Sequence, residues 1–115
     1  RGGLATCLNE IAQAQAIGIE IQETRIPVKA SVEGICETLG FDPLYLANEG
    51  KVVIIVSAKD ANEVLETLKT DDLGKESAII GRVTSESGKK VTAESAIGGK
   101  RILQMRTGEQ LPRIC

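Results

Sequence analysis

The chain is 115 residues long, with 42% hydrophobic and 26% charged residues and a formal net charge of −2. These proportions are those of one globular domain and exclude a disordered segment. A slightly acidic chain with only two aromatic residues, Phe41 and Tyr45, lacks both the basic surface and the stacking side chains of nucleic-acid-binding proteins.

The first forty residues predict two helices with a strand between them. Leucines and isoleucines recur at helical spacing among several alanines, which predicts a helix over residues 4–16 that ends at Gly18. Isoleucines then alternate with glycine or polar residues over residues 17–22, the pattern of a half-buried strand. Apolar residues three and four apart predict a second helix over residues 30–39, with Gly40 as its end.

The middle of the chain predicts a helical turn, a strand and a third helix. Asp42 before Pro43 predicts a short helical turn, because Asp caps helix starts and proline suits the first helical position. The run Val52–Val56 is apolar on both faces, which predicts a central strand, and it is too short to span a bilayer. A capping-box pattern that begins at Asp60 predicts a helix over residues 61–69.

The last third of the chain predicts three further strands, over residues 77–83, 89–92 and 101–103. Gly98–Gly99 predicts a hairpin turn between the last two, with the basic residues that follow on a solvated strand edge. The order of elements predicts an α+β fold, in which a mixed β-sheet is covered by helices. We expect the sheet to be centred on residues 51–57, with all three helices packed on it.

The three cysteines, Cys7, Cys36 and Cys115, are odd in number and show no CxxC spacing. They predict a reducing, cytoplasmic setting and no disulfide framework, and with histidine absent we expect no metal site. The first two lie where core or half-buried thiols are expected. Cys115 is the last residue, and Pro112 favours an extended approach to it, so we expect residues 108–115 to form a mobile arm with a thiol at its tip. The alternative is an ordinary chain end.

Two other segments are candidates for chemistry. Glu49 follows Asn48 in a loop that leads into the predicted central strand, where a carboxylate is a candidate general base whose pKa burial and Lys51 would tune. The alternative is an ordinary solvated turn. Gly2 and Gly3 precede the first helix, where exposed backbone N–H groups would face an anion, although glycine pairs before helices are common.

Four segments resemble the HypE family of hydrogenase expression/formation proteins in order and spacing along the whole chain: Arg1–Ala5, Leu44–Lys51, Ala78–Gly81 and Leu111–Cys115. The Pro-Arg-Ile-Cys ending is the specific motif, since opening glycines of this kind also occur in aminoimidazole ribonucleotide (AIR) synthetase and selenophosphate synthetase. The resemblance implies a fold similar to the PurM C-terminal domain. It implies that residues 1–107 are the C-terminal α+β domain of a longer protein and that residues 108–115 are a flexible tail. The opening without methionine also favours a piece of a longer chain.

In the family that the chain resembles, the terminal cysteine receives a carbamoyl group, and ATP is used to dehydrate this group to a thiocyanate. The cyanide then goes to the iron of nickel–iron hydrogenase. The resemblance implies that Cys115 carries the substrate and that Glu49 takes a proton from the amide nitrogen. It also implies that Arg1, Gly2 and Gly3 lie at a nucleotide site.

The resemblance further implies the cofactors and partners of the full-length protein. ATP and Mg²⁺ would be bound mainly by a preceding domain, so this piece alone would be inactive. The implied partners are the carbamoyltransferase HypF, the HypC–HypD scaffold complex and a second copy in a homodimer, with no nucleic acid and no membrane. Two alternatives stay open: a non-catalytic docking module for maturation partners, or a domain of another ATP-using AIR synthetase relative with a different small substrate.

Overall fold

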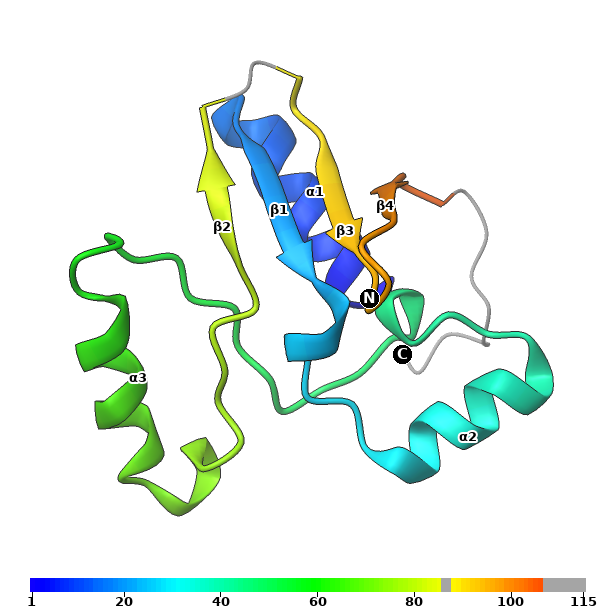
Figure 1. The fold of residues 1–115 in the computed structure, drawn as a ribbon, viewed down its shortest axis with the longest axis horizontal. Helices are drawn as coiled ribbons and strands as arrows, with labels where there is room; N and C mark the ends of the chain where they lie inside the picture. Colours follow the sequence, from blue (N-terminus) through cyan, green and yellow to red (C-terminus); the bar gives the residue numbers. More distant parts are fainter. Residues whose placement is uncertain (86–87, 107–115) are drawn as a thin grey trace.

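A mixed four-stranded sheet, with strand order β2-β1-β3-β4, forms the centre of the computed structural model, which describes residues 1–85 and 88–106 (Figure 1). Strand β1 (Gly18–Gln22) pairs antiparallel with β2 (Gly81–Thr84) and parallel with β3 (Val91–Glu94). Strand β3 also pairs antiparallel with β4 (Lys100–Leu103). The predicted fold class, α+β with a mixed sheet and helices, is confirmed.

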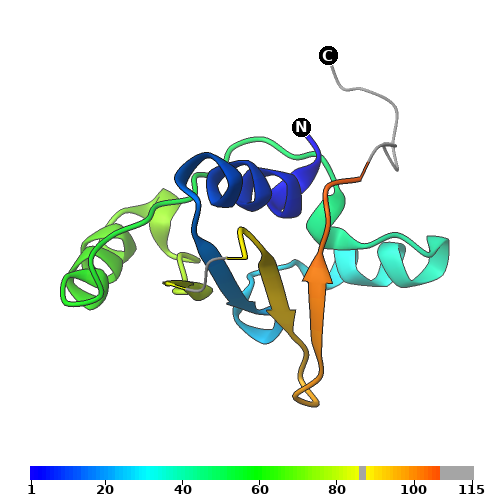
Figure 2. The ribbon, with the colours of Figure 1, turned by 90° about the horizontal axis from the view of Figure 1, so that it is seen from above.

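The helices differ in their relation to the sheet. Helix α1 (Gly3–Gln15) runs across one face of β1 and β3, whereas α2 (Ala30–Leu39) and α3 (Ala61–Lys69) lie to either side (Figure 2). The connections contain three short 3₁₀ helices, η1 (Glu23–Arg25), η2 (Pro43–Tyr45) and η3 (Asp72–Gly74). The main contacts of α2 and α3 are with η2 and η3, so these two helices do not pack on the sheet as we expected.

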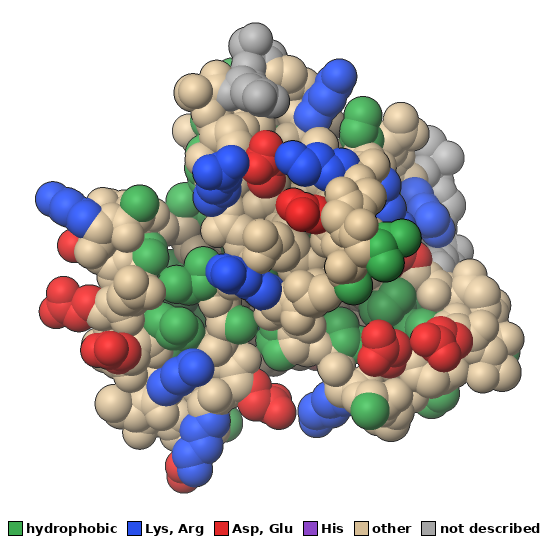
Figure 3. Space-filling view, viewed as in Figure 1, with side chains coloured by type: hydrophobic (Ala, Val, Ile, Leu, Met, Phe, Trp, Pro, Cys, Tyr) green, Lys and Arg blue, Asp and Glu red, His purple; other side chains and the backbone are tan. Residues whose placement is uncertain are grey.

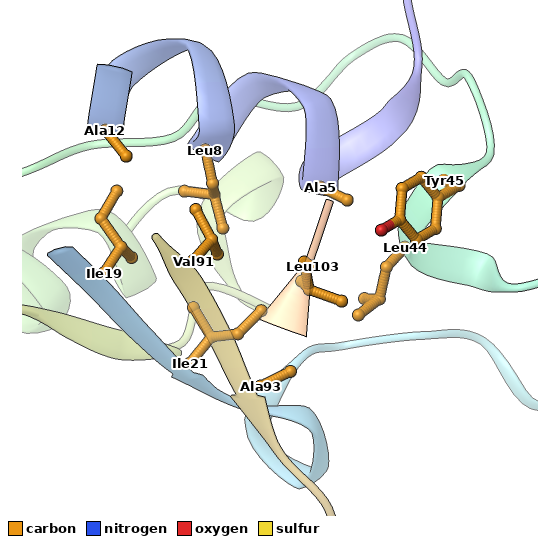
Figure 4. Packing of buried hydrophobic residues seen from close by; sticks show 10 residues of the cluster. All are labelled: Ala5, Leu8, Ala12, Ile19, Ile21, Leu44, Tyr45, Val91, Ala93 and Leu103. Atoms are coloured by element: carbon orange, nitrogen blue, oxygen red, sulfur yellow. The ribbon is translucent and has the colours of Figure 1, made fainter. Parts of the chain in front are cut away.

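The hydrophobic core lies between α1 and the sheet, and η2 closes one end of it (Figure 4). The helix contributes mostly small side chains, which let its backbone approach the strands closely. The two largest side chains that are fully buried, Val91 and Leu103, come from neighbouring strands and are paired in register. The buried cluster consists of Ala5, Leu8, Ala12, Ile19, Ile21, Leu44, Tyr45, Val91, Ala93 and Leu103.

One buried polar residue, Asn9, joins α1 to the last strand. Its side-chain nitrogen donates hydrogen bonds of 2.8 Å to the carbonyl oxygens of Ala5, one turn back on the helix, and Leu103 on β4. Both amide protons are therefore satisfied in an apolar environment, where an unmade bond would be costly.

The segment 51–57 is not a strand of the sheet, so the prediction of a central strand there is wrong. Val52 is 77% exposed, Ile54 and Ile55 are about half exposed, and only Val53 of this run packs against the core cluster. Among the described residues, no backbone hydrogen bond ties residues 49–56 to another strand. A run that is apolar on both faces indicates that a strand there would prefer to be covered on both sides. It does not indicate whether the fold has helices or a second sheet to cover it. The centre of the sheet is β1 and β3.

Several predicted boundaries also shift. The first helix ends at Gln15, where Ala16 takes the left-handed conformation (φ 54°). Gly18, which we expected to end the helix, is instead a buried residue of β1. Asp60 has helical φ and ψ and its side chain caps nothing, so the predicted capping box is wrong. Gly40 ends α2 as predicted, with φ 70° and its N–H donating to the carbonyl of Cys36.

The remaining strands agree with the sequence to within a few residues. Strand β2 begins at Gly81, later than predicted, because residues 77–80 lie outside the ladder. The predicted β3–β4 hairpin is confirmed, and its turn is closed by the N–H of Ser95 on the carbonyl of Gly99 (2.8 Å). Cys7 is half-buried and Cys36 is buried, as expected. None of the helices in the described ranges is long and apolar enough to cross a membrane.

Candidate functional site

The start of α1 lies directly against the segment Leu44–Leu46. Gly3 has φ 70°, and a Cβ atom there would lie 2.5 Å from the carbonyl oxygen of Leu44 and 2.7 Å from that of Leu46. Any side chain at this position would therefore displace backbone, and the left-handed φ also favours glycine. The helix is capped by Gly2, which is left-handed as well (φ 72°) and provides no side-chain cap.

Asp42 fixes the conformation of η2, as its position before Pro43 predicted. Its Oδ1 accepts a hydrogen bond of 3.0 Å from the N–H of Leu44. Its Oδ2 accepts a second bond, of 2.7 Å, from Nη1 of Arg101 on β4. One carboxylate thus both caps η2 and ties it to the edge of the sheet.

Arg101 also binds a second carboxylate, because its Nε donates a hydrogen bond of 2.7 Å to Oε1 of Glu23 on η1. The hydrogen bond that Arg101 donates to Asp42, reinforced by the one to Glu23 and opposed by partial burial, raises the pKa of the Arg101 guanidinium above its ordinary value. The sequence predicted a solvated strand edge for Arg101 and gave no sign of this role. Its partners are 59 and 78 residues away, so no local pattern could reveal them.

Tyr45 joins η2 to the chain that leaves β4. Its ring is buried beside Leu44 at the end of the core, and its hydroxyl donates a hydrogen bond of 2.8 Å to the carbonyl of Gln104 (Figure 4). The guanidinium carbon of Arg106 lies 4.2 Å from the centre of the ring, within cation–π range. The last residues of the described chain are thereby fixed to the segment that precedes Glu49.

Glu49 lies in an exposed loop that begins just after Leu46. The side chain of Asn48 shapes this loop: its Nδ2 donates to the carbonyl of Leu46 (3.0 Å) and its Oδ1 accepts from Nζ of Lys51 (3.0 Å). Lys51, which we expected to tune the pKa of Glu49, donates its hydrogen bond to Asn48 instead. No hydrogen bond or ion pair joins Glu49 to another described residue, so its carboxylate is available to a ligand.

The structure places one of the candidate residues, Gly3, against the segment Leu44–Leu46, whereas the nearest side chain to Gly2 is that of Thr6 on the same helix. Glu49 follows the segment Leu44–Leu46 three residues later in the sequence. Arg1 is exposed at the start of the same region. Cys115 and the rest of the predicted tail lie outside the described residues.

The start of α1 has the chemistry that a phosphate group requires. Gly2 and Gly3 have no side chains and are half-buried, the first turn carries no acidic residue, and the positive end of the dipole of a 13-residue helix lies there. Arg1 adds a positive charge. These residues fit a nucleotide phosphate. By contrast, residues 1–85 and 88–106 contain no group of three or more Asp, Glu or Cys side chains that could hold a metal ion.

The face of the sheet opposite α1 carries mixed charge. Glu20 on β1 accepts a hydrogen bond of 3.1 Å from Nη2 of Arg82 on β2, and Glu94 and Lys100 also line a shallow hollow there of about 50 Å³. Figure 3 shows that acidic and basic side chains are intermixed across this face. The hollow is too small for a nucleotide.

Residues 1–94 match the family described as AIR synthase related protein, C-terminal domain, and the chain belongs to this family. Over its whole length it is similar to HypE proteins. The carbamoyl dehydratase HypE of Rhodobacter capsulatus is 47% identical over 115 residues, which are 100% of this chain and 34% of that protein. The resemblance to HypE drawn from four sequence segments is therefore confirmed.

Two solved structures are informative neighbours. The hydrogenase maturation protein HypE in complex with ATP has a TM-score of 0.90 and 45% identity, covering 100% of this chain and 36% of its own. HypE in a HypE–HypF complex has a TM-score of 0.86 and 43% identity, covering 92% of this chain and 34% of its own. The chain thus spans about a third of the length of the curated relatives that it matches.

Proposed function

We propose that this chain, as the C-terminal domain of a full-length hydrogenase maturation factor, takes part in the ATP-dependent dehydration of a carbamoyl group on Cys115. The product is a thiocyanate that supplies cyanide to the iron of nickel–iron hydrogenase. The observation that carries the proposal is the meeting of three segments at Leu44–Leu46. These are the glycine start of α1, the loop with Glu49, and the chain that continues from β4 toward Cys115. The similarity to carbamoyl dehydratases over the whole chain supports it.

The reaction converts a thiocarboxamide, R–S–C(=O)–NH₂, into a thiocyanate, R–S–C≡N. ATP, when bound, supplies the phosphoryl group that turns the poor carboxamide leaving oxygen into phosphate. In balance, the thiocarboxamide and ATP give the thiocyanate, ADP, phosphate and one proton. The carbon–oxygen bond breaks, the nitrogen loses both of its protons, and the carbon–nitrogen triple bond forms.

Two residues of this chain have distinct parts in that change. Glu49 accepts a proton from the amide nitrogen, a role that needs an accessible carboxylate within hydrogen-bond reach of the substrate. Its exposed loop and its lack of partners among the described residues suit this role. The sulfur of Cys115 stays bonded to the reacting carbon throughout and acts as the covalent handle of the substrate.

We assign nucleotide contacts to Arg1, Gly2 and Gly3, because the charge of Arg1 and the positive end of the α1 dipole suit a phosphate. Mg²⁺ and the remaining nucleotide contacts belong to the preceding domain of the full-length protein. In this organisation residues 1–107 form the domain and residues 108–115 form a tail that carries Cys115 to the site. The isolated piece is then inactive.

The proposed partners follow from the same chemistry. HypF supplies the carbamoyl group, and a solved HypE–HypF complex with 43% identity to this chain supports that pairing. The HypC–HypD complex receives the cyanide, and a second copy of the full-length protein forms a homodimer. The competing function is a docking module with all the chemistry in the other domain.

Glu49→Gln in the full-length protein separates these two functions. Incubation with HypF, carbamoyl phosphate and ATP should add a carbamoyl mass at Cys115 alone, and the parent protein should then lose one water from that adduct. With Glu49→Gln the carbamoyl adduct should persist, whereas Glu66→Gln, an exposed glutamate on α3, should behave as the parent. Unimpaired dehydration in Glu49→Gln would favour the docking function, and an adduct on Cys7 or Cys36 would contradict the proposal.

A further inference from the structure

We propose that Tyr45 is a positioning residue that anchors the base of the arm ending in Cys115, and that it holds this base beside the loop of Glu49. That the anchor serves to place Cys115 rests on the proposed function, whereas the contacts of Tyr45 do not depend on it. Nothing in the local sequence around Tyr45 indicates this role, because its partners are about 60 residues further along the chain.

The anchor consists of two contacts made by one side chain. The Tyr45 hydroxyl donates a 2.8 Å hydrogen bond to the backbone carbonyl of Gln104, immediately after β4 ends at Leu103. The face of the same ring receives the Arg106 guanidinium at 4.2 Å. The phenol therefore fixes both the backbone and a side chain within three residues of the end of the strand, although Gln104 and Arg106 are themselves exposed.

The ring itself is well placed to act as an anchor because it does not move independently of the core. Tyr45 is 9% exposed and belongs to the buried cluster with Leu44, Leu103 and Ala5. At the start of the same 3₁₀ helix, Asp42 accepts hydrogen bonds from the N–H of Leu44 and from Arg101 on β4. The point of attachment is thus rigid, while the groups attached to it lie at the surface.

The consequence of the anchor is a defined origin for the arm. Cys115 is nine positions beyond Arg106, and a fully extended chain of nine steps reaches about 30 Å. Glu49 is only four residues from Tyr45, so the arm begins close to the carboxylate that its tip must reach. Fixing one end of a chain segment near its target raises the effective concentration of the other end there, with no new contact at the target.

The inference can be tested without any hydrogenase chemistry by measuring that effective concentration as a disulfide equilibrium. In the full-length protein with Cys7→Ala, a second thiol is placed beside Glu49 by Asn48→Cys, and its disulfide with Cys115 is titrated against glutathione. Tyr45→Phe keeps the buried ring but removes the hydroxyl, and Arg106→Gln removes the cation. We expect each to lower the effective concentration of Cys115 at position 48 by about three- to tenfold.

Arg82→Gln is the matched control for Arg106→Gln. It also removes an exposed guanidinium, but from β2, at the opposite edge of the sheet from β4. We expect it to leave the disulfide equilibrium within about twofold of the parent. An unchanged equilibrium in both Tyr45→Phe and Arg106→Gln, or an equal loss in Arg82→Gln, would overturn the proposal.

A second measurement distinguishes anchoring from general support of the site. A carbamoylated peptide with the sequence Leu-Pro-Arg-Ile-Cys, supplied in trans to full-length protein with Cys115→Ala, does not need the arm. Tyr45→Phe should slow dehydration of the attached substrate by about three- to tenfold and leave dehydration of the peptide unchanged. Equal slowing of both would mean that Tyr45 supports the site and not the arm. If no protein dehydrates either substrate, the proposed function fails, and the disulfide equilibrium still decides the anchor.

Discussion

Asp42 and Arg101, 59 residues apart, form an ion pair with Nη1 and Oδ2 2.7 Å apart, and this pair joins the cap of η2 to the last strand. Asp42 is mostly buried, whereas about half of the Arg101 side chain is exposed. The pair therefore connects the rigid scaffold with the segment that carries Tyr45 and leads to Glu49. Its two members should differ in how much they contribute to stability.

Asp42→Ala should lower the free energy of unfolding by about 1–2 kcal/mol, because it removes the η2 cap as well as the pair. Arg101→Gln should cost only about 0.5–1 kcal/mol, since solvent screens a half-exposed guanidinium. A double-mutant cycle, measured by urea denaturation, should show non-additivity, because the two side chains touch. Strictly additive losses would mean that the pair contributes nothing to stability.

The pH dependence of this contribution follows from the raised pKa of Arg101. A base with a folded-state pKa above its unfolded value stabilises the fold fully below the unfolded value and loses that contribution only as pH rises through the folded value. For arginine this window lies in strongly alkaline solution. The cost of Arg101→Gln should therefore stay constant from neutral to mildly alkaline pH, as repeated denaturation curves would show.

Gly3 and Gly40 offer a matched test of the contact between α1 and η2. Both have φ 70°, but a Cβ atom on Gly3 would collide with the carbonyls of Leu44 and Leu46, whereas one on Gly40 would meet nothing within 4 Å. Gly40→Ala should cost about 1 kcal/mol, the conformational penalty alone. Gly3→Ala should cost at least about 1 kcal/mol more, because overpacking adds to that penalty. Equal melting temperatures for the two variants would refute the close approach.

Asn9 should tolerate neither a neutral nor a charged replacement. Asn9→Ala removes the buried hydrogen bond to the carbonyl of Leu103 and should cost about 1–3 kcal/mol. Asn9→Asp should cost more at neutral pH, because a carboxylate cannot donate to either carbonyl and would be buried beside two acceptors. Urea denaturation of both variants checks the order, and a smaller loss for Asn9→Asp would contradict it.

The sequence predicted the elements whose signals are local. The helical spacing of α1, the Gly40 end of α2, the cap of Asp42 and the glycine turn of the β3–β4 hairpin each depend on neighbours within a few residues. The contacts that assemble the candidate site are not local. Tyr45 with Gln104 and Arg101 with Glu23 join parts of the chain that only the sheet order brings together, so the sequence could not reveal them.

The segment 51–57 shows a different limit. The valines and isoleucines of this run have strong strand propensity, and periodicity alone predicts burial on both sides. Burial requires a second layer, and the described chain places its one covering helix, α1, over β1 and β3. A pattern of residue types predicts the environment that a segment prefers, whereas the environment that it receives depends on the arrangement of all the other elements.

Alanine substitutions at Val91 and Val52 measure the difference between a buried strand position and an exposed one. Val91 is 0% exposed at the centre of the core, whereas Val52 is 77% exposed and lies outside the sheet. Val91→Ala removes two buried methyl groups and should lower the free energy of unfolding by about 2 kcal/mol. Val52→Ala removes the same atoms from a solvated position and should cost less than about 0.5 kcal/mol. Denaturation of the 115-residue chain gives both values under one condition. If Val52→Ala were as costly as Val91→Ala, residues 51–57 would be a buried strand after all, and the sheet would have a different centre.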